Sequence, residues 1–158
     1  MLLYLRTDLL EMLRSLRPGG NMSQRRMIAM LAVATLPVVM AGYVVNSLDP
    51  SLLTGLPTLA VANLVFAALL WHADRSGALV RQIGHMRFGS AIIIGFAQCL
   101  ALIPGASRSG VTMTAARYLG FERLAAARFS LLLSIPTIAG AGLLKGADIV
   151  AEGDVALG

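Results

Sequence analysis

A cluster of polar residues interrupts the apolar second half of the chain. The segment PGASRSGVT, residues 104–112, follows the run AIIIGFAQCLAL and places Arg108 between Ser107 and Ser109, with Thr112 three residues further on. A guanidinium presents a planar fork of donors that suits two oxygens of a phosphate, and the hydroxyls add further donors. The residue types and their spacing therefore predict a site for an oxyanion, with phosphate as the expected anion.

The residues around these side chains have backbone roles. Pro104 ends the preceding helix because it lacks an N–H group, while Gly105 and Gly110 permit conformations that are closed to other residues. A helix beginning near Gly110 would direct its free N–H groups and the positive end of its dipole at the same place. The alternative interpretation is structural: Ser109 caps this second helix and Arg108 extends to a membrane interface.

The composition is typical of an integral membrane protein. Of the 158 residues, 57% are hydrophobic and 13% are charged, against about 45–50% and about 25% in soluble domains. The net charge is +5, and 12 of the 13 basic residues are Arg. Because the arginines lie in short segments between apolar runs, they indicate membrane topology rather than nucleic-acid binding. The single cysteine, Cys99, cannot form an internal disulfide.

The apolar runs predict an all-α fold, a helical bundle that forms one polytopic membrane domain over residues 1–158. Each long run covers the length that a helix needs to cross a bilayer, and a basic segment with leucines at helical spacing precedes the first. We expect an interfacial amphipathic segment at 6–26 and membrane spans at 27–45, 52–71 and 129–144.

A re-entrant helix pair is predicted over residues 88–119. The apolar run 88–103 has 16 residues, which as a helix cover about 24 Å and fall short of a bilayer core of about 30 Å. The Pro-Gly break that follows favours a return to the side of entry, so the 104–112 motif would form the tip of a hairpin.

The distribution of charged residues predicts which side of the membrane each connecting segment faces. Segment 6–26 is rich in Arg, and so are two predicted basic loops, residues 72–87 and a later loop with Arg117, Arg123 and Arg128. The turn NSLDP has neither Arg nor Lys. The hairpin topology collects every Arg-rich segment on one face, which the positive-inside rule makes cytoplasmic. Two full crossings by the short helices would give the same sidedness, so only their shortness and the Pro-Gly break favour the hairpin. The tip of the hairpin would then face a cavity that opens outward.

The stretch FAQCLALIPGASRSGVT, followed by LGFERLAAARFSLLLSIPTIAGAGLLK, closely resembles the undecaprenyl-diphosphate phosphatase family, also called the bacitracin-resistance family. The signature Pro-Gly-x-Ser-Arg-Ser-Gly-x-Thr is complete over 104–112, and the resemblance is strong over roughly 88–145 and looser over 1–87. It implies multi-pass enzymes of the bacterial inner membrane that hydrolyse undecaprenyl diphosphate to undecaprenyl phosphate and phosphate. They recycle the lipid carrier of peptidoglycan synthesis, and their active site faces the periplasm.

The resemblance also implies roles for individual residues. Arg108 would stabilise the charge of the transition state, Ser107 would act at the reacting phosphate as nucleophile or as hydrogen-bond donor, and Thr112 is a further catalytic position of the motif. Gln98, six residues before Pro104, is interpreted as a polar helper or a packing group. The residues expected to bind substrate are Gly105, Ser109, Gly110 and Gln98.

Part of the family pattern does not occur in this chain. The family contains two inverted repeats, and the first carries a Glu-rich motif and a Pro-x-Ser-Ser-x-Gly-His segment. Neither occurs here, so we expect the chain to be the second half of the architecture, a fragment whose first repeat precedes residue 1. The family implies a divalent cation, Mg²⁺ or Ca²⁺, but its acidic ligands are not in this chain and no residue is assigned to a metal. His72 and His85 are interpreted as solvated residues of a basic loop.

A second class of function fits the same residues. Broken helices with an anion site at membrane depth also occur in inverted-repeat transporters, so the alternative is a non-catalytic lipid-phosphate binder or half of a transporter. The expected partners are a polyprenyl diphosphate lipid, the bilayer and a further copy of the chain in a homo-oligomer, with no nucleic acid.

Overall fold

The computed structural model describes residues 10, 15, 21–47, 56–76 and 80–156, and nearly all of them are helical. Within these residues there is no β-strand beyond one isolated bridge between Arg81 and Phe121, which confirms the predicted all-α fold. The elements are α2 (Met22–Ser47), α3 (Leu56–Arg75), the 3₁₀ turn η2 (Ile83–His85), α4 (Phe88–Gln98), the 3₁₀ turn η3 (Cys99–Leu102), α5 (Arg108–Tyr118) and α6 (Arg123–Ala156).

Three of these helices are long and apolar enough to cross a membrane, namely residues 22–45 of α2, 57–75 of α3 and 123–143 of α6. The chain is a membrane protein. Most of the predicted interfacial segment 6–26 lies outside the described residues. At its described end, Asn21 caps α2, because its side-chain oxygen accepts the N–H of Ser23 at 3.1 Å.

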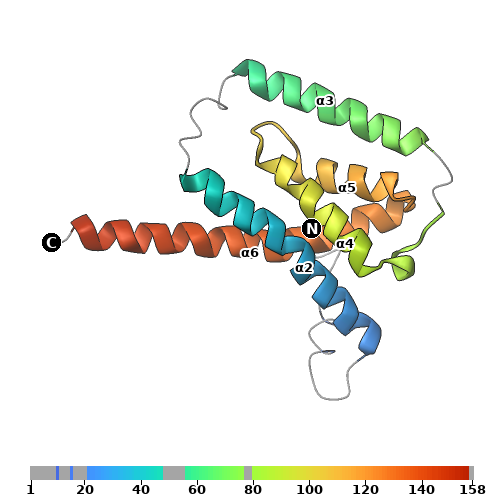
Figure 1. Ribbon diagram of the computed structural model, residues 1–158, viewed down its shortest axis with the longest axis horizontal. Coiled ribbons are helices and arrows are strands. Elements are labelled where there is room, and N and C mark those ends of the chain that lie inside the picture. Colours follow the sequence, from blue (N-terminus) through green and yellow to red (C-terminus); the bar gives the residue numbers. More distant parts are fainter. Residues whose placement is uncertain (1–9, 11–14, 16–20, 48–55, 77–79, 157–158) are drawn as a thin grey trace.

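Helices α4 and α5 form an antiparallel hairpin inside a frame made by the three long helices (Figure 1). Helix α2 packs against α4 and α6, α3 packs against α5, and α5 also packs against α6. The hairpin turn, residues 103–107, lies at the end where α3 begins. The ends at which α4 starts and α5 finishes lie together at the opposite side of the bundle. The chain therefore enters and leaves the hairpin at one end, and its passage into a bilayer from that end stays a prediction.

Close approach of backbones holds the hairpin against its frame. A Cβ added to Gly95 of α4 would lie 2.5 Å from the carbonyl oxygen of Ala34 in α2, so only glycine permits this crossing. Ala34, Ile94, Phe129 and Leu133 are fully buried around it and form the core between α2, α4 and α6.

Helix α6 begins at Arg123, six residues before the predicted span 129–144. The expectation that Arg123 and Arg128 lie in a basic loop is therefore wrong. Buried residues at positions 125, 129 and 133 share one helix face, and their apolar contacts extend the helix back to Arg123. The true connection between α5 and α6 is only residues 119–122.

The first basic loop is also shorter than predicted, because α3 continues to Arg75. His72 is not a loop residue: it lies in the last turn of α3, and its Nδ1 is 2.8 Å from the Tyr118 hydroxyl of α5. Asp74 lies on the same turn and pairs with Arg117 of α5 at 2.7 Å and with Arg123 of α6. This turn therefore fastens α3 to the other two helices.

Candidate functional site

The turn between η3 and α5 is held in a conformation that only glycine adopts easily. Gly105 has φ of +92°, and a Cβ at this position would lie 2.6 Å from the carbonyl oxygen of Leu59 in the first turns of α3. The turn therefore combines a left-handed residue with a close approach of two backbones. This contact places the motif beside the start of α3.

Ser107 caps the helix that follows. Helix α5 begins at Arg108, two residues before the predicted start near Gly110, and the Ser107 side-chain oxygen accepts the N–H of Gly110 at 3.4 Å. The alternative interpretation, in which Ser109 is the cap, is wrong for this structure. Gly110 leaves room for the cap, since a Cβ there would lie 3.3 Å from Cβ of Ser107.

Ser107 and Ser109 form a pair of exposed hydroxyls at the N-terminus of α5. Their Oγ atoms are 3.3 Å apart, and either can donate to the other. The free N–H groups of the first turn and the positive end of the helix dipole lie at the same place. An oxyanion in front of this turn would meet hydroxyl donors and backbone donors together.

Thr112 lies deeper, behind that surface. Its side chain is 2% exposed, and its hydroxyl is 2.6 Å from the Ser130 hydroxyl of α6. The same Thr112 oxygen is 3.0 Å from the carbonyl oxygen of Arg108 and 3.2 Å from that of Ser109. The structure therefore does not bring Thr112 to the exposed surface of Ser107 and Ser109. The Thr112 hydroxyl instead holds the first turn of α5 against α6.

Arg108 extends into a cavity of about 110 Å³ inside the bundle. The cavity is bounded by α2, η3 and α6, with Val38, Gly42, Leu102 and Thr137 among its lining residues. The guanidinium has no hydrogen-bond or ion-pair partner among the residues that the structure describes. Its five N–H donors are therefore open to a ligand, and no described carboxylate neutralises its charge.

Gln98 is connected to that cavity through Thr137. Gln98 is fully buried, and its amide oxygen lies 3.3 Å from the Thr137 hydroxyl. That hydroxyl can donate its one hydrogen either to this oxygen or to the carbonyl oxygen of Leu133, 2.7 Å away. The amide nitrogen has no partner among the described residues. Either orientation of the amide leaves one of its two ends unsatisfied, and a buried polar group without a partner costs about 1–3 kcal/mol.

The polar side chains of the site thus fall into two neighbouring groups, and Thr112 lies behind the outer one. The outer group consists of Ser107 and Ser109 at the exposed start of α5, and the inner group consists of Arg108 with Thr137 and Gln98. Two polar residues of α6 were missed by the sequence analysis, Ser130 behind the first group and Thr137 in the second. They are seven residues apart, which is two helical turns, so both face α5 and α4 from one side of an apolar helix. That spacing was visible in RFSLLLSIPT.

The described residues do not fit a divalent cation at this site. They contain no group of three or more His, Cys, Asp or Glu side chains that could hold a metal. Asp74 is at the opposite end of the hairpin, engaged with two arginines. The divalent cation, Mg²⁺ or Ca²⁺, stays an expectation from the family resemblance, which places its acidic ligands outside this chain.

Comparisons with known proteins agree with the resemblance. The family described as "Bacitracin resistance protein BacA" matches residues 1–157. The chain is similar to the undecaprenyl-diphosphatase of Chromohalobacter salexigens, with 46% identity over 87% of the chain and 52% of the relative. It is also similar to those of Alcanivorax borkumensis, with 43% identity over 96% of the chain and 58% of the relative, and Gloeobacter violaceus, with 44% over 96% and 55%.

The chain spans about half the length of the curated relatives it matches. Within that half the match covers nearly every residue, from the first helices through the motif to the end of α6. With the signature complete from Pro104 to Thr112 and the family match over almost the whole sequence, the chain belongs to the bacitracin resistance protein BacA family.

Proposed function

We propose that the chain forms part of a membrane phosphatase that hydrolyses undecaprenyl diphosphate to undecaprenyl phosphate and inorganic phosphate. Its relatives are named undecaprenyl-diphosphatase. The observation that carries the proposal is Arg108, a guanidinium in a cavity of the bundle with no partner among the described residues, next to two paired hydroxyls. A diphosphate would supply the negative charge that Arg108 lacks nearby, and its oxygens would accept hydrogen bonds from the guanidinium and the two hydroxyls.

The chemistry asked of the site is the cleavage of one phosphoanhydride bond. Water adds to the terminal phosphorus, and the bond from that phosphorus to the bridging oxygen breaks. The bridging oxygen leaves with the polyprenyl phosphate. One proton of the water stays on the released phosphate, and the other passes to a phosphate oxygen of either product or to solvent. Arg108 and the first N–H groups of α5 stabilise the charge that spreads over the phosphoryl oxygens. Ser107 either attacks the phosphorus, with water then cleaving the phosphoserine, or orients the attacking water.

Buried groups hold those donors in place. Thr112 and Ser130 fix the first turn of α5 on α6, and Thr137 links the cavity of Arg108 to Gln98. Gln98 lies directly before η3, so its amide can hold the inner end of the cavity without carrying charge. These residues position the site rather than react.

The positions of the arginines support an orientation for the site. Arg75, Arg87, Arg117 and Arg123 lie at the end where α4 begins and α5 finishes, and Arg108 is at the other end of the hairpin. Under the positive-inside rule the first end is cytoplasmic. We therefore propose that the motif faces the periplasm of a bacterial inner membrane, where it would meet the diphosphate headgroup of the lipid carrier.

The test uses the complete gene product that contains this chain, purified in detergent and supplied with undecaprenyl diphosphate. We expect one inorganic phosphate released for each lipid converted to the monophosphate, and loss of this release in the Arg108→Ala variant. Binding of the lipid without any release of phosphate would support the alternative of a non-catalytic binder or transporter half, and would contradict the enzymatic proposal.

A further inference from the structure

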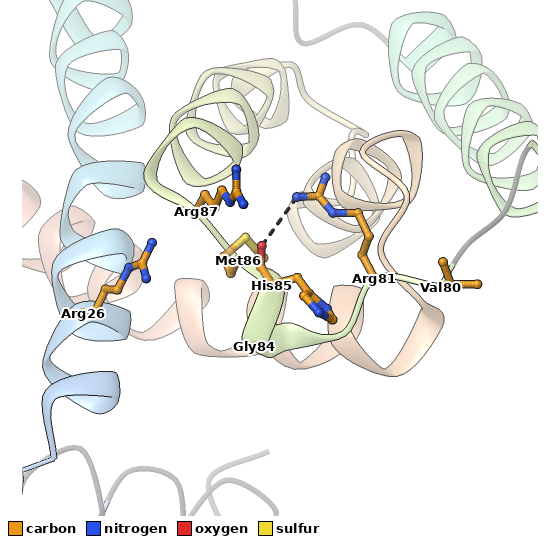
Figure 2. A pocket seen from close by; sticks show the side chains of 7 residues that line it. All are labelled: Arg26, Val80, Arg81, Gly84, His85, Met86 and Arg87. Atoms are coloured by element: carbon orange, nitrogen blue, oxygen red, sulfur yellow. Dashed lines mark hydrogen bonds between the residues drawn. The ribbon is translucent and has the colours of Figure 1, made fainter.

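A second basic site lies at the arginine-rich end of the bundle, away from the motif. A pocket of about 490 Å³ opens there between α2 and the residues that precede α4. Figure 2 shows arginine side chains reaching it from α2 and from both sides of the η2 turn. Its lining consists of Arg26, Val80, Arg81, Gly84, His85, Met86 and Arg87.

Two of these arginines have no partner among the described residues. Neither Arg26 nor Arg87 makes a hydrogen bond or an ion pair with any of them, and no carboxylate lines the pocket. Asp74 forms ion pairs with Arg117 and Arg123, which do not line this pocket. Two open guanidinium groups on one pocket leave a local positive charge for an anion to neutralise.

Arg81 supplies a third positive charge in a fixed position. Its guanidinium donates to the carbonyl oxygen of Leu119 at 2.8 Å and lies 4.5 Å from the ring centre of Phe121. The Arg81 backbone is also paired on both sides, with Gly120 and with Glu122 at 3.0 Å each. The loop that forms one wall of the pocket is therefore tied to the α5–α6 connection rather than free to close over the charge.

The surroundings of the pocket decide which anion it takes. Val80 in its wall is 73% exposed, and Phe88, directly after Arg87, is 41% exposed. The pocket also includes Arg26, near the start of the candidate span 22–45. Apolar side chains beside arginines without described partners, close to the start of a span, are typical of a membrane interface. We propose that this pocket binds the phosphate headgroup of an anionic phospholipid rather than free phosphate from solution. The acyl chains of the lipid would lie along the exposed apolar side chains.

This lipid site is separate from the proposed phosphatase site. Arg87 stands immediately before α4, while Arg108 follows η3 at the other end of the hairpin. The 15 residues of α4 and η3 between them cover at least about 22 Å of helix. Neither site contributes a residue to the other, so the two proposals can fail independently.

The experiment is native mass spectrometry of the complete gene product in detergent, with phosphatidylglycerol and phosphatidylcholine of identical acyl chains added as competing probes. We expect preferential retention of phosphatidylglycerol. Arg26→Gln and Arg87→Gln should each weaken it about fivefold, because one arginine near a lipid headgroup contributes about 1 kcal/mol. The matched control is Arg75→Gln, which removes the same charge from the same end but from a side chain stacked 4.3 Å from the Trp71 ring, outside the pocket.

Several results would overturn the proposal. Equal weakening by Arg75→Gln would show diffuse attraction to the arginine-rich end instead of a site, and equal retention of the two lipids would show no headgroup recognition. Competition by millimolar inorganic phosphate would identify a free-anion site. Arg108→Ala should leave the retention unchanged. If a variant fails to fold, the unsubstituted protein still decides the outcome. Its preference for phosphatidylglycerol must fall when the salt concentration is raised from about 0.1 M to about 1 M.

Discussion

The hydroxyl of Thr112 lies 2.6 Å from the hydroxyl of Ser130, and this contact fastens the first turn of α5 to α6. The Ser130 hydroxyl is also 3.4 Å from the carbonyl oxygen of Ser109. A single pair of buried hydroxyls therefore fixes the turn that presents Ser107 and Ser109. The motif threonine is therefore buried behind the exposed hydroxyls of Ser107 and Ser109.

A double-mutant cycle tests this relationship. Thr112→Val and Ser130→Ala should each lower the free energy of unfolding in detergent by about 1 kcal/mol, because each removes one buried hydrogen bond. The double variant should lose less than the sum, since both changes remove the same contact. Additive losses would show that the two hydroxyls act separately.

Replacement of Gly105 by alanine should destabilise the turn. A residue with a side chain at φ of +92° costs on the order of 1–3 kcal/mol, and the new Cβ would press on the carbonyl oxygen of Leu59. The control is Gly142→Ala, on an open face of α6 where a Cβ meets nothing within 4 Å. Thermal melting in detergent should show a lower transition for Gly105→Ala alone. A Gly105→Ala variant as stable as the control would contradict this view of the turn.

The arginines paired with Asp74 should differ in importance. Arg117 is 5% exposed and also donates to the carbonyl oxygens of Phe121 and Asp74, at 2.9 and 3.1 Å, whereas the Arg123 side chain is exposed. Arg117→Ala should lower the melting temperature by several degrees, and Arg123→Ala by much less, because exposed ion pairs contribute little. Equal shifts for the two variants would show that burial does not determine the strength of this junction.

A substitution of Gln98 distinguishes a role in packing from a role in the site. Gln98→Met keeps the length of the side chain and removes an amide of which one end has no described partner, so the melting temperature should stay the same or rise. Because the proposal assigns the amide to positioning the cavity of Arg108, phosphate release by the complete gene product should fall about tenfold. Unchanged activity would make Gln98 a packing residue only.

The sequence located the hairpin and its turn because Pro104, Gly105 and the flanking apolar runs have unambiguous backbone preferences. It did not identify the cap, since Ser107 and Ser109 both fit the pattern of a helix N-terminus and only the φ and ψ angles of the turn distinguish them. Other differences between the sequence prediction and the structure arise because burial depends on tertiary packing. Arg117 is read from sequence as a topology signal. Only tertiary packing reveals that it is buried and donates to Asp74 of α3 and to Phe121 in the α5–α6 connection.

The partners of the motif could not be found from its own residues. Ser130 and Thr137 lie 18 and 39 positions from the side chains they contact, and hydroxyls in an apolar helix also bond their own backbone, as Thr137 does with Leu133. Their seven-residue spacing marks a shared helix face. Which helix that face meets depends on the fold.

The most direct test of the proposed function compares three variants of the complete gene product for phosphate release from undecaprenyl diphosphate. Arg108→Ala should lower kcat/KM by at least about 10²-fold, as loss of a transition-state donor does. Arg108→Lys should recover part of that loss by restoring the charge without the planar fork, and Arg75→Ala should match the unsubstituted protein. An Arg108→Ala variant that keeps more than about a tenth of the activity would contradict the assignment of the phosphate to Arg108.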